Sequence, residues 1–284
     1  MAPKRFLFAV RPWTVWAALA ALLSLSACSA PATRSVDEAS EGQDRAKAEP
    51  SAAPAAQRRA GLRLALATAY FQQGQDEVAL DELRQALASQ PDLVPALNLR
   101  GLVHLRLGQW PQAERSLQRA LALAPQDADV AHNLAWTLCQ QPQPQTQVQY
   151  EDMAALFQLA LAQPGYAHAA RSWTALGVCQ QRAARLPQAQ ASLVQAWRLE
   201  PANLPVAVLL AQVHGALSQW QEASQVMAQA HARLPASAQS LWLAAKVARK
   251  LDNQALFRQS VEQLRQEFGR SPQALALDKG LFDE

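Results

Sequence analysis

Four prolines recur at a regular interval and constrain this 284-residue chain more than any other feature of its sequence. Pro91 and Pro125 are 34 residues apart, and so are Pro201 and Pro235. The interval from Pro125 to Pro201 is 76 residues, which is two periods of 34 plus eight. Self-similarity at such a period predicts an array of stacked structural repeats.

A 34-residue period is that of the tetratricopeptide repeat, and the residue pattern resembles that family. Small positions let two antiparallel helices approach, and bulky positions fill the gaps between repeats. In residues 170–203 these positions are Trp173, Leu176, Gly177, Ala189, Leu193, Ala196 and the closing Pro201. Residues 60–93, 94–127 and 204–237 keep the same register. The predicted fold is all-α, a superhelical tetratricopeptide-repeat solenoid of about six helix-turn-helix repeats.

The third repeat, residues 128–167, is interrupted. Its first helix is predicted over 130–139 and its second over 150–163. Between them, Pro142 and Pro144 lack the amide donors that continue a helix. The eight additional residues are therefore expected in a lengthened turn.

The repeats are expected to occupy residues 58–284. A degenerate sixth unit over 238–270 suits the end of an array, and a tail with a short helix follows it. Residues 28–57 are rich in Ala, Pro, Ser and charged residues and show no apolar period. Such a segment cannot bury enough surface to offset its ordering entropy, so it is predicted to be a disordered, flexible tether.

Residues 1–27 have the layout of a secretion signal. Lys4, Arg5 and Arg11 precede an uncharged, mostly apolar run over 13–25. The run is shorter than the about 20 residues that span a bilayer. It is therefore expected to be cleaved and not to remain as an anchor.

The signal ends in Leu25-Ser26-Ala27-Cys28, which resembles the lipobox of bacterial lipoproteins. The resemblance implies cleavage before Cys28 and lipidation of its thiol. Ser29, where retained lipoproteins have Asp, implies export to the outer membrane. Several acyl chains on one residue anchor a protein stably, so the chain is predicted to be lipid-anchored and to face the periplasm.

The positive charge of the chain belongs to this signal. Three of the 26 basic residues and none of the 23 acidic ones precede Cys28, so 23 of each remain in the mature chain. A neutral mature chain argues against a nucleic-acid partner, which requires a basic face.

The sequence shows no constellation of catalytic or metal-binding residues. The five histidines are scattered through different repeats, and His104 and His214 share an offset that is normally Tyr, which indicates packing. We find no metal-spaced His pair, no Gly-rich phosphate loop and no recognisable nucleophile with its base. We therefore expect no enzyme activity, no metal, no cofactor and no small-molecule substrate.

The order of lipobox, tether, six repeats and long third turn resembles the type IV pilus biogenesis and stability lipoproteins of the PilW/PilF type. The segments 132–139 and 241–272 are also similar to that family, although Ala135 replaces its usual Gly. The resemblance implies a pilotin that binds the outer-membrane secretin of the type IV pilus and promotes its localisation and multimerisation. The alternative is another outer-membrane adaptor that serves cell-wall enzymes, barrel assembly or polysaccharide secretion.

In this repeat type, the first helix of each repeat lines the concave surface. In the first two repeats, the inner offsets and the positions between them carry Leu64, Thr68, Phe71, Asn98, Leu102 and Leu105. An apolar groove flanked by polar groups indicates a protein-interaction surface, here for a segment of the secretin. The alternative is that these residues pack against the tether or neighbouring helices.

Two cysteines, Cys139 and Cys179, fall in the first helices of adjacent repeats. The expected periplasmic location is oxidising. Two alternatives stay open: a disulfide, which needs Cα atoms within about 7 Å, or two buried free thiols.

Overall fold

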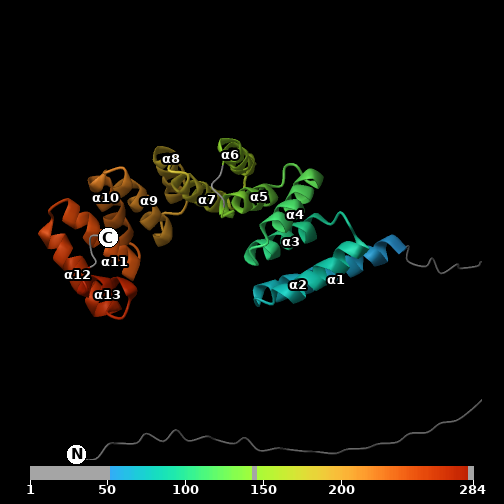
Figure 1. Cartoon of the computed structure of the whole chain (residues 1–284), viewed down its shortest axis with the longest axis horizontal. Coiled ribbons are helices and arrows are strands. Elements are labelled where there is room, and N and C mark those ends of the chain that lie inside the picture. Colours follow the sequence, from blue (N-terminus) through green and yellow to red (C-terminus); the bar gives the residue numbers. More distant parts are fainter. Residues whose placement is uncertain (1–51, 143–145, 281–284) are drawn as a thin grey trace, which may run out of the picture. The chain divides into compact units, whose positions relative to one another are not determined.

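The computed structural model describes residues 52–142 and 146–280, in which every regular element is an α-helix. The signal, Cys28 and most of the expected tether lie outside these described residues. The helices are α1 (Ala52–Gln72), α2 (Asp76–Ser89), α3 (Val94–Arg106), α4 (Trp110–Leu123), α5 (Ala128–Gln140), α6 (Gln147–Leu161), α7 (Ala169–Arg182), α8 (Leu186–Leu199), α9 (Leu204–Ala216), α10 (Trp220–His231), α11 (Ala238–Lys250), α12 (Gln254–Phe268) and α13 (Pro272–Asp278) (Figure 1). Within the described ranges, no helix combines the length and the apolarity needed to cross a membrane.

The helices pair in chain order, and the pairs stack (Figure 1). α1 packs on α2, α3 on α4, and so on to α11 on α12, and each of α2, α4, α6, α8 and α10 also contacts the helix that follows it. The odd-numbered helices from α1 to α11 contact one another in sequence. We call this series the odd-helix row. The predicted all-α tetratricopeptide-repeat solenoid is confirmed, with six helix pairs in the described chain.

The first helix begins earlier than the sequence indicated. Residues 52–57 were expected in the tether, but they form the start of α1. Four of these six residues are Ala, the best helix former, and Pro54 lies in the first turn, where its missing amide breaks no hydrogen bond. The expected tether boundary after residue 57 is therefore corrected to the start of α1.

In the first two and the last three helix pairs, the turn between the two helices contains one residue with positive φ, and within each group these residues are 34 apart. In the first two pairs it is Gly74 and Gly108, with φ of 75° and 70°. In the last three pairs it is Ala184, Ser218 and Asp252, with φ of 56°, 60° and 53°. A left-handed backbone favours Gly, so each of the last three turns carries strain of about 1 kcal/mol.

The third pair breaks this register. One period after the turn glycine of the second pair, the chain has Pro142, whose ring fixes φ at about −65° and excludes the left-handed conformation. Six residues, 141–146, separate α5 from α6, against three, 107–109, in the second pair, so only three of the eight additional residues expected in this turn lie there. Another three lie between α6 and α7, where seven residues, 162–168, replace the four of 124–127. α6 starts after Thr146, whose hydroxyl accepts a hydrogen bond from the Gln149 amide. α5 and α6 begin slightly before the predicted positions 130 and 150.

Two glycines lie where the second helix of a pair packs against the backbone of the first. A Cβ on Gly101 of α3 would lie 2.4 Å from Cγ of Leu117 on α4. A Cβ on Gly177 of α7 would lie 2.6 Å from Cγ of Leu193 on α8. Both leucines are fully buried. These glycines let a leucine of the second helix pack directly on the backbone of the first.

The last helix pair is covered by α13. Ala274 is buried and Leu277 is partly buried, and both belong to a core cluster with Leu241, Leu264 and Trp242 of α11 and α12. The short tail helix therefore completes the core at the end of the repeats.

Candidate protein-interaction surface

The six predicted groove residues lie on α1 and α3, the first two helices of the odd-helix row. Leu64 and Phe71 of α1 are partly buried and pack against the core cluster that contains Leu83 and Leu97. Thr68 donates its hydroxyl hydrogen bond to the Leu64 carbonyl at 2.9 Å. These three side chains of α1 are therefore engaged within the fold itself.

Phe71 is also covered by a cation from α3. The Arg106 guanidinium lies 3.7 Å from the Phe71 ring centroid and donates to the Phe71 carbonyl at 2.6 Å. Arg106 Nε donates to both carboxylate oxygens of Asp76, at 2.8 and 2.9 Å. Arg106 thus links the ends of α1 and α3 to the start of α2. A charged replacement of Phe71 would remove its ring from this contact and from the core and would disturb folding.

Leu102 and Leu105 of α3 are partly exposed. Beside them, Asn98 Oδ1 accepts a hydrogen bond from Asn133 Nδ2 of α5 at 2.9 Å. Asn133 Oδ1 accepts in turn from the Arg171 guanidinium of α7 at 3.1 Å. Asn98, Asn133 and Arg171 form a hydrogen-bonded series along the odd-helix row, which we call the polar ladder.

Sequence reasoning found Asn98 but missed the other two members of the ladder. Asn133 follows Asn98 by 35 residues, close to one period. The offset that selected Asn98 selects His132 in the third repeat, so Asn133 lies one position beyond it. Arg171 follows by a further 38 residues and occupies a different offset of its repeat, because the residue equivalent to Asn133 in the fourth repeat is Ala175.

A hollow of about 330 Å³ opens beside the ladder between α5 and α7. Trp136 and Val178 give it apolar walls, and Thr174 and Asn203 give it polar groups. An apolar surface with a few fixed polar groups is typical of a peptide-binding site. We define the row surface as Leu102, Leu105, the polar ladder and this hollow.

A partly buried chain of hydrogen bonds links α5 to α7 beside this surface, and its His132 also lines the hollow. Ser172 Oγ donates to the Tyr166 hydroxyl at 3.3 Å, and Tyr166 donates to Asp129 at 3.1 Å. Because the Ser172 proton is used in this way, Nδ1 of His132 is the donor to Ser172 Oγ, at 2.8 Å. Burial, helped by the positive charge of Arg171, lowers the pKa of His132 to about 3. The imidazole is therefore neutral near pH 7.

His104 and His214, which occupy the position that is normally Tyr in this repeat, each form a hydrogen bond across the turn of their helix pair. His104 Nδ1 donates to Gln109 Oε1 at 2.6 Å, and His214 Nδ1 donates to Gln219 Oε1 at 2.7 Å. Each bond spans the turn between the two helices of a pair. Among residues 52–142 and 146–280, no group of His, Cys, Asp and Glu side chains could hold a metal ion.

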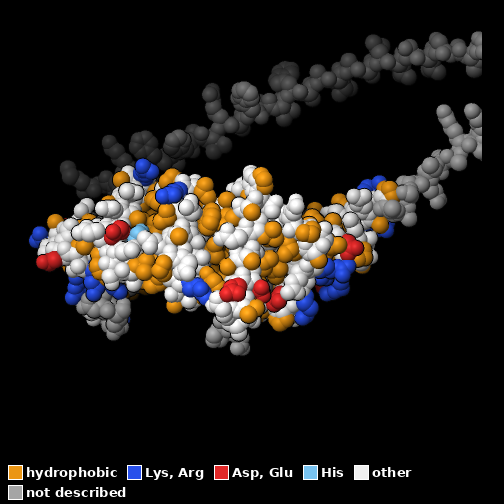
Figure 2. Space-filling view, turned by 90° about the horizontal axis from the view of Figure 1, so that it is seen from above, with side chains coloured by type: hydrophobic (Ala, Val, Ile, Leu, Met, Phe, Trp, Pro, Cys, Tyr) orange, Lys and Arg blue, Asp and Glu red, His pale blue; other side chains and the backbone are white. Residues whose placement is uncertain are grey.

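Charge is mixed on the face of the molecule shown in Figure 2. Basic and acidic side chains both occur on it, among apolar ones. A nucleic-acid site would need a face on which one sign dominates.

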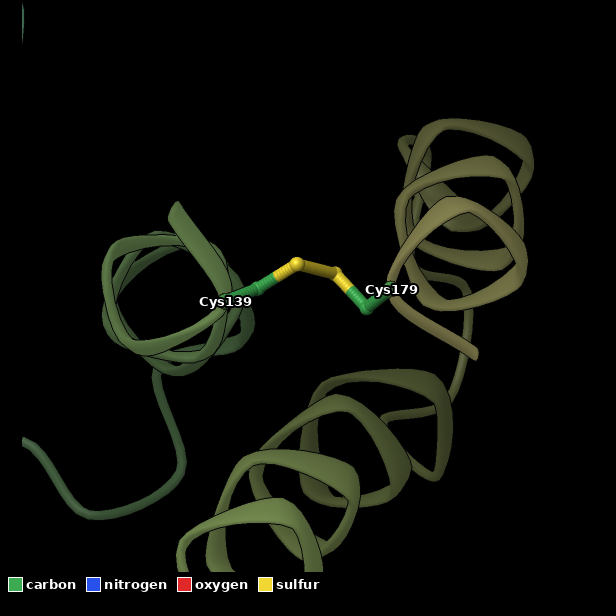
Figure 3. The surroundings of a disulfide bond; sticks show 2 residues. All are labelled: Cys139 and Cys179. Atoms are coloured by element: carbon green, nitrogen blue, oxygen red, sulfur yellow. A yellow bond between two sulfur atoms is a disulfide. The ribbon is translucent and has the colours of Figure 1, made fainter. Parts of the chain in front are cut away.

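Cys139 and Cys179 are joined by a disulfide, with their Cα atoms 5.8 Å apart (Figure 3). Of the two alternatives left open by the sequence, the structure has the bridge. It links α5 directly to α7, which belong to different helix pairs. Beside it, the Arg185 guanidinium lies 3.9 Å from the ring centroid of Tyr150 on α6. The disulfide and the cation–π contact therefore lie close to Gln141 and Pro142, where the turn begins.

Comparison with known proteins identifies the repeat. The family model described as "Tetratricopeptide repeat" matches residues 64–128 and 98–160. These are tetratricopeptide repeats. No curated protein matches the chain in sequence.

Solved structures share the fold over most of the chain. PilW, described as a widely conserved type IV pilus biogenesis factor, has a TM-score of 0.67 at 23% identity, covering 77% of this chain and 97% of PilW. PilF of Pseudomonas aeruginosa has 0.65 at 20% identity, covering 80% and 99%. YrrB, described as having an unusual peptide-binding site, has 0.53 at 13% identity, covering 69% and 97%. The resemblance to the PilW/PilF type is thus confirmed at the level of the fold.

Proposed function

We propose that this chain is an outer-membrane lipoprotein that acts in type IV pilus biogenesis, by binding the pilus secretin and promoting its localisation and multimerisation. The observation that carries the proposal is that the fold of this chain matches that of PilW over 97% of PilW and that of PilF over 99% of PilF. The lipobox that ends at Cys28 adds support, because it implies an anchor at the membrane where a secretin is assembled.

The proposed role of the lipid is to position the repeats. Each buried methylene contributes about 0.8 kcal/mol, so several acyl chains on Cys28 hold the protein stably at the membrane. The repeats would then face the periplasm at the end of a tether. A client segment bound there is kept close to its site of assembly.

The proposed binding site is the row surface. Leu102 and Leu105 offer partly exposed apolar side chains, and the polar ladder offers amide and guanidinium groups beside them. An extended or helical segment of the secretin could bury its apolar side chains on the leucines and pair its polar groups with the ladder. The role is one of binding, without a chemical step, a metal or a cofactor.

Deletion of the gene tests the function. We expect loss of heat-resistant secretin multimers and of surface pili, and recovery of both when the chain is restored. A Cys28→Ala chain should fold and yet fail to place the secretin at the outer membrane. Intact multimers with normal pili in the deletion strain would overturn the proposal and favour the adaptor alternative.

Paired substitutions test the surface. Leu102→Asp with Leu105→Asp should abolish capture of the periplasmic part of the secretin while the far-ultraviolet circular dichroism stays unchanged. The matched control is Leu123→Asp with Leu199→Asp, because these leucines of α4 and α8 are 43% and 54% exposed and lie off the odd-helix row. Normal capture by the first pair would exclude the row surface as the binding site.

A further inference from the structure

One face of α1 is open to solvent, because α1 starts the array and no helix pair precedes it in the described chain (Figure 1). We call it the leading face. Its residues recur at intervals of three or four, which places them on one side of the helix. They are all exposed, and they are Arg58, Arg59, Leu62, Ala65, Leu66 and Ala69.

The corresponding face of the next odd-numbered helix is covered. The positions one period after Leu62 and Ala69 hold Ala96 and Val103 of α3, and both are fully buried. They belong to the same core cluster as residues of α2, the helix that precedes α3. The leading face is therefore the surface that a preceding helix pair would cover.

The leading face is more apolar than the free end of a repeat array. Terminal repeats normally present a polar outer face, which keeps the array soluble. Here Leu62 is 68% exposed, and Leu66, one turn later, is 44% exposed. At the other end of the array, α13 covers the last pair. Two large apolar side chains exposed together on one helix face indicate a contact with another surface.

The charge of α1 has one sign. The helix contains Arg58, Arg59 and Arg63 and no Asp or Glu. Arg63 forms an ion pair with Glu82 of α2 at 2.9 Å. Arg58 and Arg59 lie nearer the start of α1, whereas the acidic residues of α2 all lie in its first half, which is beside the end of α1. The leading face therefore combines two exposed cations with exposed leucines.

The chain before α1 leads to the proposed lipid anchor. Residues 28–51 connect Cys28 to the start of α1, and even fully extended they span at most about 85 Å. α1 is thus the described helix that lies nearest along the chain to the anchor. Tethering of this kind raises the effective concentration of a surface, so a weak contact made by α1 is occupied much of the time.

We propose that the leading face of α1 lies on the phospholipid surface to which the chain is anchored. Arg58 and Arg59 contact anionic headgroups, and Leu62 and Leu66 enter the boundary between headgroups and acyl chains. An interfacial helix combines basic side chains with an apolar face and lies in the plane of the membrane. Charge complementarity and the short connection to Cys28 carry the assignment.

The proposal rests on the lipid anchor of the proposed function and deepens it. The leading face shares no residue with the row surface, so the membrane and a secretin segment are assigned to different parts of the molecule. The lipid would then hold the chain at the membrane, and α1 would fix how the first helix pair is oriented there.

The test measures cosedimentation with vesicles of phosphatidylethanolamine and phosphatidylglycerol. It uses residues 28–284 with Cys28→Ser, so that no lipid is attached. We expect binding that weakens with added salt and that falls by about 30-fold in Arg58→Gln with Arg59→Gln. Leu62→Ser with Leu66→Ser should also weaken it, by about tenfold. The assay contains neither secretin nor anchor, so its failure is distinct from that of the proposed function.

Matched controls remove similar side chains elsewhere. Arg198→Gln with Arg233→Gln removes two exposed arginines of the later pairs, and Leu123→Ser with Leu199→Ser removes leucines that are 43% and 54% exposed. Both control chains should bind the vesicles like the unmodified leading face.

Three results would overturn the proposal. One is equal binding by the Arg58, Arg59 variant and its arginine control. Another is equal binding to vesicles of phosphatidylcholine alone. The third is a dimer in sedimentation equilibrium that is lost in the Leu62, Leu66 variant, without any binding to vesicles, because this would assign the leading face to a second copy of the chain.

Discussion

The second and third helix pairs bring their helices together in different ways. In the second pair, Gly108 makes a tight turn and Gly101 lets Leu117 pack on the backbone of α3. In the third pair, Pro142 excludes that turn, and α5 is held to α7 by a disulfide and by the hydrogen-bond chain from His132. Where the tight turn of a pair is interrupted, bonds between odd-numbered helices link α5 to α7.

The same contrast appears at the position that Gly101 occupies in the second pair. Ala135 lies one period after Gly101 and is fully buried. It belongs to a core cluster with Met153 and Phe157 of α6. In place of the Gly101–Leu117 contact, the third pair packs Ala135 with the buried side chains of Met153 and Phe157.

Removal of the disulfide should have the largest effect. In Cys139→Ala with Cys179→Ala, we expect the free energy of unfolding to fall by about 4 kcal/mol, because the bridge closes a loop with a sequence separation of 40 residues. Urea unfolding measures this, and the reduced unmodified chain should show a similar loss. A loss under about 1 kcal/mol would mean that packing alone holds the third and fourth pairs together.

A methyl group at the tight contact of the second pair should have the next largest effect. Gly101→Ala is expected to destabilise the chain by about 2 kcal/mol, since the added Cβ would lie 2.4 Å from Leu117 Cγ. The penalty should shrink when Leu117 is also changed to Ala, as a double-mutant cycle measures. Gly61→Ala is the matched control, because its Cβ would meet nothing within 4 Å and should stabilise α1 by up to about 1 kcal/mol. Equal effects of the two alanines would contradict the packing account.

The buried histidine should make stability fall in acid. The folded pKa of His132 is about 3, below the unfolded value of about 6.5. Its contribution is therefore complete above about pH 6.5 and is lost progressively as the pH falls toward 3, by about 2 kcal/mol at pH 5. Urea unfolding at several pH values should show a flatter profile for His132→Asn.

Another histidine serves as the control for this slope. Burial also lowers the pKa of His231, so some pH dependence should remain in His132→Asn and decrease further when His231 is replaced as well. An unchanged slope in His132→Asn would show that the hydrogen-bond chain does not require a neutral imidazole.

Relief of the strained turns should give the smallest effect. Ala184→Gly is expected to stabilise the chain by about 0.5–1 kcal/mol, because Ala184 has a φ of 56°. Gly108→Ala should change stability in the opposite direction by a similar amount, since Gly108 has a φ of 70°. Thermal unfolding of both variants measures the difference, and a destabilised Ala184→Gly would show that this turn is not strained.

The sequence predicted what depends on offsets within the period. Helix pairs, their order, the packing glycine Gly177 and the interrupted turn all follow from residues spaced at short and regular intervals. The helical start of α1 was missed because residues 52–57 have helix propensity but no apolar period.

Contacts between repeats were harder to predict. Arg106 contacts Phe71, which lies 35 residues earlier in the chain. The polar ladder connects α3, α5 and α7. Such contacts depend on how one repeat stacks on the next, which the spacing of residues leaves undetermined. The choice between a disulfide and free thiols stayed open for the same reason.

Hydrogen exchange of the full chain, alone and with the periplasmic part of the secretin, tests the central claim most directly. That claim is that the row surface binds the partner, while the disulfide and the His132 hydrogen-bond chain hold this surface together. We predict slower exchange over residues 98–105 of α3 and 133–136 of α5 on binding, with no change in α2 or α6. Slower exchange in α2 or α6, with α3 and α5 unchanged, would contradict the account.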